Sequence, residues 1–199
     1  MTTEGARTSS DANNPLGRDA VVSAVLTHAA DLFAERGPAA TSIRDIAERA
    51  GVNHGLVFRH FGAKDKLVTA VLDHLSAETA EFADSGALSP DDPRLRRHWV
   101  VLARCILDGY PVGQMQRRFP VITALIDHAR AHRADDRDAA LSAAHVAAFV
   151  LGWQLFEPFL RNAAGLDSVP NAQLREAINA EAVRILCGSP HPFPTDGNQ

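Results

Sequence analysis

Cysteine is scarce in this sequence of 199 residues, which contains only Cys105 and Cys187 and has no CxxC pair. Disulfide frameworks need several cysteines and an oxidising compartment. We therefore expect both thiols to be buried and unreactive in a reducing cytosol.

Long apolar runs are also lacking, because His, Gly or Arg interrupts every long apolar stretch. A membrane-spanning helix needs roughly 20 mainly apolar residues, so we expect no membrane partner. Residues 1–17 have no apolar segment typical of a secretory signal, and their many Thr, Ser, Asn and Gly residues predict a disordered tail. These observations favour a cytoplasmic location.

The motifs of common catalytic sites are missing. The sequence contains no HExxH, no GxSxG, no glycine-rich phosphate loop and no prominent carboxylate pair. His128 and His132 lie four residues apart and are able to chelate from one helical face, but Asp127, Arg130 and Arg133 indicate a solvated surface. We expect no catalytic residue, no enzymatic activity, no cofactor and no metal site.

Helical periodicity is what the sequence does contain, and no segment alternates with the period of two that strands require. The pattern predicts an all-α protein of about nine helices. The expected helices lie at 18–36, between the Ser42 cap and Gly51, and at 53–60, 64–82, 95–107, 114–118, 120–131, 137–162 and 172–186. Pro158 is expected to kink or end the eighth of these, and residues 84–93 and 189–199 read as a loop and a tail.

Residues 41–67 read as two short helices joined by a tight turn, followed by the start of a third helix. Ser42 and Asp45 have the spacing of a capping box, and Gly51 follows the last turn of the first helix. Val57 and Phe61, four residues apart, are expected to face the core. This arrangement predicts a helix-turn-helix, whose second helix enters the major groove of DNA.

The same stretch resembles the TetR (tetracycline-repressor-like) family of transcriptional regulators. The resemblance rests on Thr41–Ala47, then Ala50-Gly51-Val52, then Phe58–Phe61, with Gly62, Lys64 and Leu67 after them. It implies a DNA-binding domain at 18–66 and an effector-binding and dimerisation domain at 67–188. Phe58 stands where the family usually has tyrosine, so one hydroxyl contact to the DNA backbone is missing.

Eleven residues are predicted to contact double-stranded DNA. Asn53 and His54 begin the recognition helix, where base edges are read, and Arg59 can pair with guanine or phosphate. Leu56 would meet a thymine methyl group or pack in the core. The complete set is Thr41, Ser42, Arg44, Asn53, His54, Gly55, Leu56, Phe58, Arg59, His60 and Lys64, of which His60 and Lys64 look like the phosphate contacts of the family.

Charge gives only modest support to DNA binding. The formal net charge of the chain is −4, and residues 18–66 hold seven Lys and Arg against six Asp and Glu, a balance of +1. Affinity for DNA would therefore depend on the local placement of a few cations such as Arg44, Arg59, Lys64 and Lys66 rather than on bulk charge.

The resemblance also implies a small-molecule effector and a homodimer. An apolar pocket that suits a hydrophobic or aromatic ligand is predicted among Trp99, Tyr110, Met115, Phe119, Trp153 and Gln154, although each of them also fits an ordinary core. Two-fold, palindromic operators need two recognition helices, hence a dimer. The last two long helices, with small residues at Ala140, Ala143, Ala144, Ala147 and Ala148, are the predicted dimer interface or part of the core.

The leading interpretation is a ligand-responsive DNA-binding transcriptional regulator, most simply a repressor released from its operator by the effector. The alternative is a helical small-molecule-binding or enzymatic bundle whose degenerate helix-turn-helix no longer binds DNA. A regulator that activates, or that answers to a protein partner, also fits the sequence.

Overall fold

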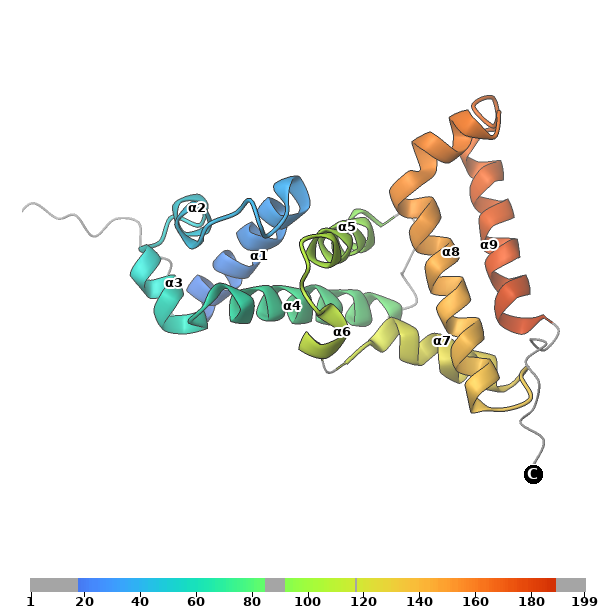
Figure 1. Cartoon of the computed structure of the whole chain (residues 1–199), viewed down its shortest axis with the longest axis horizontal. Helices are drawn as coiled ribbons and strands as arrows, with labels where there is room; N and C mark the ends of the chain where they lie inside the picture. The colour runs from blue at the N-terminus through green and yellow to red at the C-terminus, as the bar shows by residue number, and fades with distance from the viewer. Residues whose placement is uncertain (1–17, 85–91, 117, 189–199) are drawn as a thin grey trace, which may run out of the picture. The chain divides into compact units, whose positions relative to one another are not determined.

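The structure, a computed structural model, describes residues 18–84, 92–116 and 118–188. Within these residues the chain forms nine helices and no strand, which confirms the predicted all-α class (Figure 1). The helices are α1 (Arg18–Arg36), α2 (Ile43–Arg49), α3 (His54–Phe61), α4 (Lys64–Asp84), α5 (Pro93–Leu107), α6 (Val112–Met115), α7 (Pro120–Arg130), α8 (Asp136–Ala163) and α9 (Asn171–Cys187).

The chain divides into two compact units. Unit 1 comprises the residues up to Leu75 together with Val101–Gln116, and unit 2 comprises Ser76–Val100 together with the residues from Arg117 onward. The predicted tails at 1–17 and 189–199, and most of the predicted loop at 84–93, lie outside the described residues. The functional division into domains at 18–66 and 67–188 stays a prediction.

Unit 1 is built around one apolar core to which α1, α2, α3 and α4 each contribute. Phe33, Ile46, Val57 and Leu72 are fully buried in it. The expected inward direction of Val57 is confirmed, and Phe61 packs partly against the same cluster. Since α3 spans only eight residues, it depends on this packing, because isolated helices of that length are unstable in water.

Local signals in the sequence placed most helix ends correctly. Ser42 caps α2 and forms the expected capping box with Asp45, and Gly51 has the left-handed φ of 66° that a helix stop requires. One expectation was wrong. The short α6 begins directly after Pro111 rather than at Gln114, because proline suits a helix start. Helix α8 runs from Asp136 through Pro158 to Ala163, close to the expected bounds, and a kink at Pro158 stays a prediction.

Unit 2 contains a second core in which α8 packs against both α7 and α9 (Figure 1). Ala129, Ala139, Val146 and Leu186 form its buried cluster. In the part of the unit that comes from Ser76–Val100, His98 is buried, stacks on Trp99 with 5.2 Å between ring centroids, and lies 3.0 Å from Thr79 Oγ1.

Candidate nucleic-acid interface

An open depression of about 720 Å³ lies on unit 1 where the start of α2, the start of α3 and the start of α4 come together. Seven of the residues predicted to contact DNA line it, namely Thr41, Ser42, Arg44, His54, Gly55, Phe58 and Lys64. The structure thus gathers residues that lie up to 23 positions apart in the sequence, from Thr41 to Lys64, around one surface. Asn53, Leu56, Arg59 and His60 do not line the depression.

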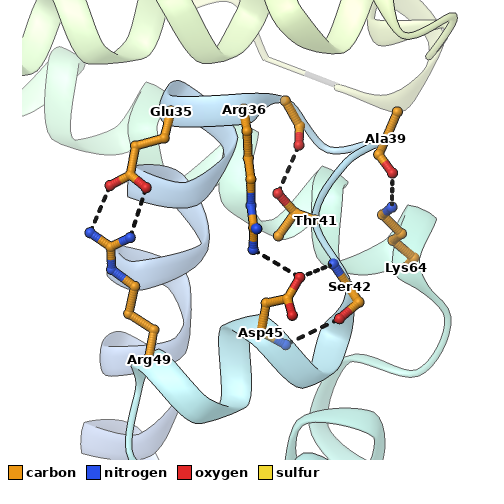
Figure 2. Close-up of polar contacts among 9 residues, drawn as sticks. Glu35, Arg36, Ala39, Thr41, Ser42, Asp45, Arg49 and Lys64 are labelled. Carbon is orange, nitrogen blue, oxygen red and sulfur yellow. Dashed lines mark hydrogen bonds and ion pairs between the residues drawn. The ribbon is translucent and has the colours of Figure 1, made fainter.

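Two reciprocal hydrogen bonds hold the N-terminus of α2. The Asp45 backbone N–H donates to Ser42 Oγ at 3.1 Å, and the Ser42 backbone N–H donates to Asp45 Oδ2 at 2.9 Å (Figure 2). Arg36 donates to the same carboxylate oxygen at 2.8 Å. The Ser42 backbone bond, with smaller help from its hydroxyl and from Arg36, holds the pKa of Asp45 below its ordinary value.

The Thr41 hydroxyl makes a hydrogen bond within unit 1. Its Oγ1 donates to the Gly37 carbonyl at 2.8 Å, and only 1% of the residue is exposed (Figure 2). The neighbouring Ser42 is exposed, but its hydroxyl oxygen already accepts the capping bond. A threonine that closes the loop between α1 and α2 gives the same sequence pattern as one that binds phosphate, so the contact of Thr41 with DNA stays a prediction.

Asn53 is the N-cap of α3, and its Oδ1 accepts a 2.8 Å hydrogen bond from the Gly55 backbone N–H. The amide that was predicted to read a base therefore also stabilises the start of the recognition helix. Asn53 is an exposed residue, and this bond uses only its side-chain oxygen. His54, the next residue, is likewise exposed.

Two arginines of the predicted DNA-binding domain are paired with carboxylates. Arg36 pairs with Asp45, and Arg49 makes two hydrogen bonds to Glu35 at 2.7 and 2.8 Å. The bonds from Arg49 lower the pKa of the Glu35 carboxyl.

Arg44 and Arg59 are both exposed. In the part of the chain that the structure describes, neither of them pairs with a carboxylate. Their charge is therefore available to phosphate.

Aromatic and apolar residues of α3 differ sharply in exposure. Phe58 is 61% exposed and lines the depression, whereas Leu56 is half-buried and packs against the core of unit 1. The core role of Leu56, which the sequence left open, is therefore the one that its surroundings support. His60 is half-buried, and its ring meets Phe61 edge-on at 6.5 Å.

Lys64 is the first residue of α4, and its Nζ lies 3.5 Å from the Ala39 carbonyl oxygen (Figure 2). The backbone N–H groups in the first turn of a helix attract anions, so lysine and helix end favour the same ligand. Sequence reasoning missed Ala39 and Asp108, which contact each other within unit 1. Their separation of 69 residues leaves no local signal.

The six predicted effector residues are divided between the units. Tyr110 and Met115 pack against the core of unit 1. Trp99, Phe119, Trp153 and Gln154 belong to unit 2, where Trp99 is buried and its Nε1 has no hydrogen-bond partner among the described residues. Whether they bind an effector stays a prediction.

Comparisons with known proteins agree with this geometry. Residues 25–71 match the family model described as bacterial regulatory proteins, tetR family. The HTH-type transcriptional repressor Rv3405c of Mycobacterium tuberculosis is 53% identical over 178 residues, which are 89% of this chain and 94% of that protein. The HTH-type transcriptional repressor KstR2 of the same species is 43% identical over 67 residues, which cover 32% of this chain and 34% of the relative.

Solved structures agree as well. A transcriptional regulator from Rhodococcus sp. superposes with a TM-score of 0.60 at 25% identity, covering 83% of this chain and 95% of the other. A TetR-like transcriptional regulator from the same genus gives a TM-score of 0.57 at 24% identity, covering 87% of this chain and 100% of the other. The second likeness concerns the fold.

Proposed function

Because this chain belongs to the TetR family of bacterial regulatory proteins, which are transcriptional regulators rather than enzymes, we propose that it is a cytoplasmic repressor that a small molecule releases from its operator. The alternative of a helical bundle with a degenerate helix-turn-helix has no support. The observation that carries the proposal is the depression between α2, α3 and α4, bordered by the uncompensated charge of Arg44 and by Lys64.

Each part of that surface has its own role toward DNA. His54 and the amide NH₂ of Asn53 read base edges from the start of α3. Arg44, Arg59 and Lys64 bind phosphates and fix the register of the helix without reading sequence. Phe58 contributes apolar contact from its exposed ring, in place of a hydroxyl hydrogen bond worth about 0.5–1.5 kcal/mol.

The second half of the proposal is a homodimer formed by α8 and α9. Ala140, Ala144 and Ala148 recur every four residues along α8 and are all exposed, so they lie along one ridge of the helix. Phe156, further along the same helix, is exposed as well. Phe159 is also exposed, to 68%. Small residues between large apolar ones allow two helices to approach closely and bury the stripe.

By length and composition alone α8 would also pass for a membrane span, and only 22% of its most apolar window is buried within the chain. Core helices of other proteins pass the same test. A second copy of this chain is the occupant that a two-fold operator demands, with recognition helices about 34–36 Å apart.

The effector is proposed to bind unit 2 near Trp99, Phe119, Trp153 and Gln154. Buried tryptophan nitrogens normally have a partner, and the unpartnered Trp99 Nε1 supplies a donor for a polar group on an otherwise apolar ligand. By linkage, effector and operator must weaken each other's binding by the same factor.

The test is a selection of operator sequences from random DNA by the full-length protein, followed by binding titrations at several salt concentrations. We expect a palindromic sequence, bound by a dimer, with an affinity that falls steeply as salt rises through counterion release. Enrichment of no sequence, together with equal binding to random DNA at low salt, would overturn the proposal.

A further inference from the structure

Three potential metal ligands from distant parts of the chain meet in unit 2. One ligand atom each from His128, His132 and Cys187 lies within 4.8 Å of the other two. The sequence pointed only to the two histidines and predicted no metal site. The third ligand, 55 residues further along the chain than His132, becomes a neighbour only through folding.

The two histidines lie on one side of a nearly continuous helical turn. His128 is in the last turn of α7, and the His132 backbone N–H donates to the Ala129 carbonyl at 2.8 Å. This bond keeps the chain coiled after α7 ends, so the i, i+4 relation holds. The ring centroids are 5.8 Å apart, and the rings are inclined at 46°.

Cys187 is brought to the histidines by the packing of the C-terminus of α9 against α7. Ala129, next to His128, is fully buried and belongs to the same apolar cluster as Leu186. Cys187 packs against this cluster. Arg133, next to His132, donates from Nε to the Leu186 carbonyl at 3.2 Å and from Nη2 to the Ile185 carbonyl. The residues beside each ligand thus hold the two segments together.

We propose that His128, His132 and Cys187 form a binding site for a thiophilic metal ion, and that Zn²⁺ is the ion it binds. Two imidazole nitrogens and one thiolate are a donor set that Zn²⁺ accepts, with Zn–N of about 2.0–2.1 Å and Zn–S of about 2.3 Å. These lengths need ligand atoms roughly 3.3–3.6 Å apart in tetrahedral geometry. Rotation of the two exposed histidine side chains closes the remaining distance.

The site has the features of an accessible rather than an enclosed centre. Both histidines are exposed and Cys187 is half-buried, so an ion can enter from solvent. The fourth position is open to water or to an added ligand, as in three-ligand zinc sites. The Cys187 thiol loses its proton on binding, and the affinity therefore falls at low pH.

The experiment uses the full-length protein without a histidine tag, reduced and stripped of metal, and titrated first with Co²⁺ and then with Zn²⁺. We expect one Co²⁺ per chain, with the visible absorption of a four-coordinate ion and an ultraviolet band from sulfur-to-cobalt charge transfer. Zn²⁺ should displace the cobalt and raise the Tm, because it binds the folded chain more tightly than the unfolded chain.

Variants locate the binding. Cys187→Ser should abolish the charge-transfer band, and His132→Ala should weaken Zn²⁺ binding by more than the roughly 10- to 100-fold that loss of an outer partner costs. His132→Cys replaces one ligand with another, so it should keep the ion and strengthen the charge-transfer band. Circular dichroism spectra and the Tm of the apo forms establish that each variant folds.

Matched controls are Cys105→Ala, which removes the buried thiol of unit 1, and His145→Ala, which removes an exposed histidine from α8. Neither should change the stoichiometry or the spectrum. Zn²⁺ affinity that is equal in the wild type and Cys187→Ser, or a cobalt spectrum without charge transfer, would overturn the proposal. Because the readouts involve no DNA, these outcomes are independent of the operator experiment.

Discussion

The carboxylate of Asp108 accepts a hydrogen bond from the backbone N–H of Ala39, with 2.6 Å between Oδ2 and the nitrogen. The acceptor follows the end of α5, and the donor lies in the loop that leads into the helix-turn-helix. Both residues belong to unit 1. The position of this loop therefore depends on a segment that follows it by 69 residues.

Gly37→Ala should destabilise unit 1 strongly. Gly37 has a φ of 82°, and an added Cβ would lie 2.8 Å from Asp108 Oδ2. The left-handed conformation alone costs an alanine about 1–2 kcal/mol, and the contact adds to it. Urea unfolding should show a larger loss for Gly37→Ala than for Gly51→Ala, which has a φ of 66° but no atom within 4 Å.

The contact between the added Cβ at position 37 and the Asp108 carboxylate is measured with a second variant, Asp108→Ala. Alone, Asp108→Ala should lower the free energy of unfolding by about 1 kcal/mol, because the hydrogen bond from Ala39 to an exposed carboxylate is lost. The double variant Gly37→Ala with Asp108→Ala should be less destabilised than the sum of the single changes, since the alanine no longer meets the carboxylate. Strict additivity would show that the two side chains do not touch.

Lys64→Ala and Asn53→Ser should separate affinity from specificity. Loss of Lys64 removes a phosphate contact, so binding to all DNA sequences should weaken about equally and the salt dependence should become shallower. Asn53→Ser keeps an oxygen that can cap α3 but removes the amide NH₂. The discrimination between bases at one base pair of the operator should therefore change by about 1–3 kcal/mol. Selection from random DNA measures the preference, and titrations at several salt concentrations measure the affinity. A changed preference in Lys64→Ala alone would reverse the roles.

Phe159→Glu should convert the dimer into monomers. It places a charge on the exposed apolar side of α8, where a partner helix would have to bury it. Sedimentation velocity should then give a monomer, and operator affinity should fall by 10-fold or more, about 1.4 kcal/mol. Leu107→Glu is the matched control, since Leu107 is 84% exposed on unit 1; a monomer in both variants, or in neither, contradicts the proposed interface.

Stability should fall as the pH drops from about 6.5 to about 4 because of His98. Burial lowers the pKa of His98 from its ordinary 6.5 to about 4. Between these values the unfolded chain binds the proton and the folded chain does not, so acid favours unfolding, by about 1.4 kcal/mol per pH unit at most. Above pH 6.5 the contribution is complete, and below pH 4 no more is lost.

The measurement is the free energy of unfolding in urea as a function of pH for the wild type and for His98→Gln. Glutamine cannot titrate in this range and retains a hydrogen-bonding group for Thr79, whose Oγ1 lies 3.0 Å from the His98 ring nitrogen. The difference between the two proteins should shrink as the pH falls from 6.5 to 4. Parallel curves would mean that the pKa of His98 is the same in the folded and the unfolded chain.

Local chemistry made much of this molecule predictable from its sequence. The Ser42 capping box, the turn at Gly51 and the burial of Val57 depend on neighbours within a few residues, and all three appear in the structure. The family resemblance rested on the same short stretch, which is why the class of protein was correct.

What the sequence does not reveal has a different cause. A hydroxyl before a helix fits two roles, and only the fold reveals that the Thr41 hydroxyl bonds to Gly37. The approach of Cys187 to His128 depends on how α9 packs on α7, and no periodicity encodes that. Long-range packing, rather than local propensity, decides such sites.

Ala39 is held at both polar groups of its backbone. Asp108 accepts from its N–H, and the Lys64 ammonium lies 3.5 Å from its carbonyl oxygen. The amide proton of this one residue therefore reports on the segment after α5, and its carbonyl reports on the lysine that we assign to phosphate. Amide hydrogen exchange at Ala39 should be slower while its N–H is bonded to Asp108 than when that bond is broken. The exchange rate of this single backbone proton therefore measures how often the loop before the helix-turn-helix leaves its position in the structure.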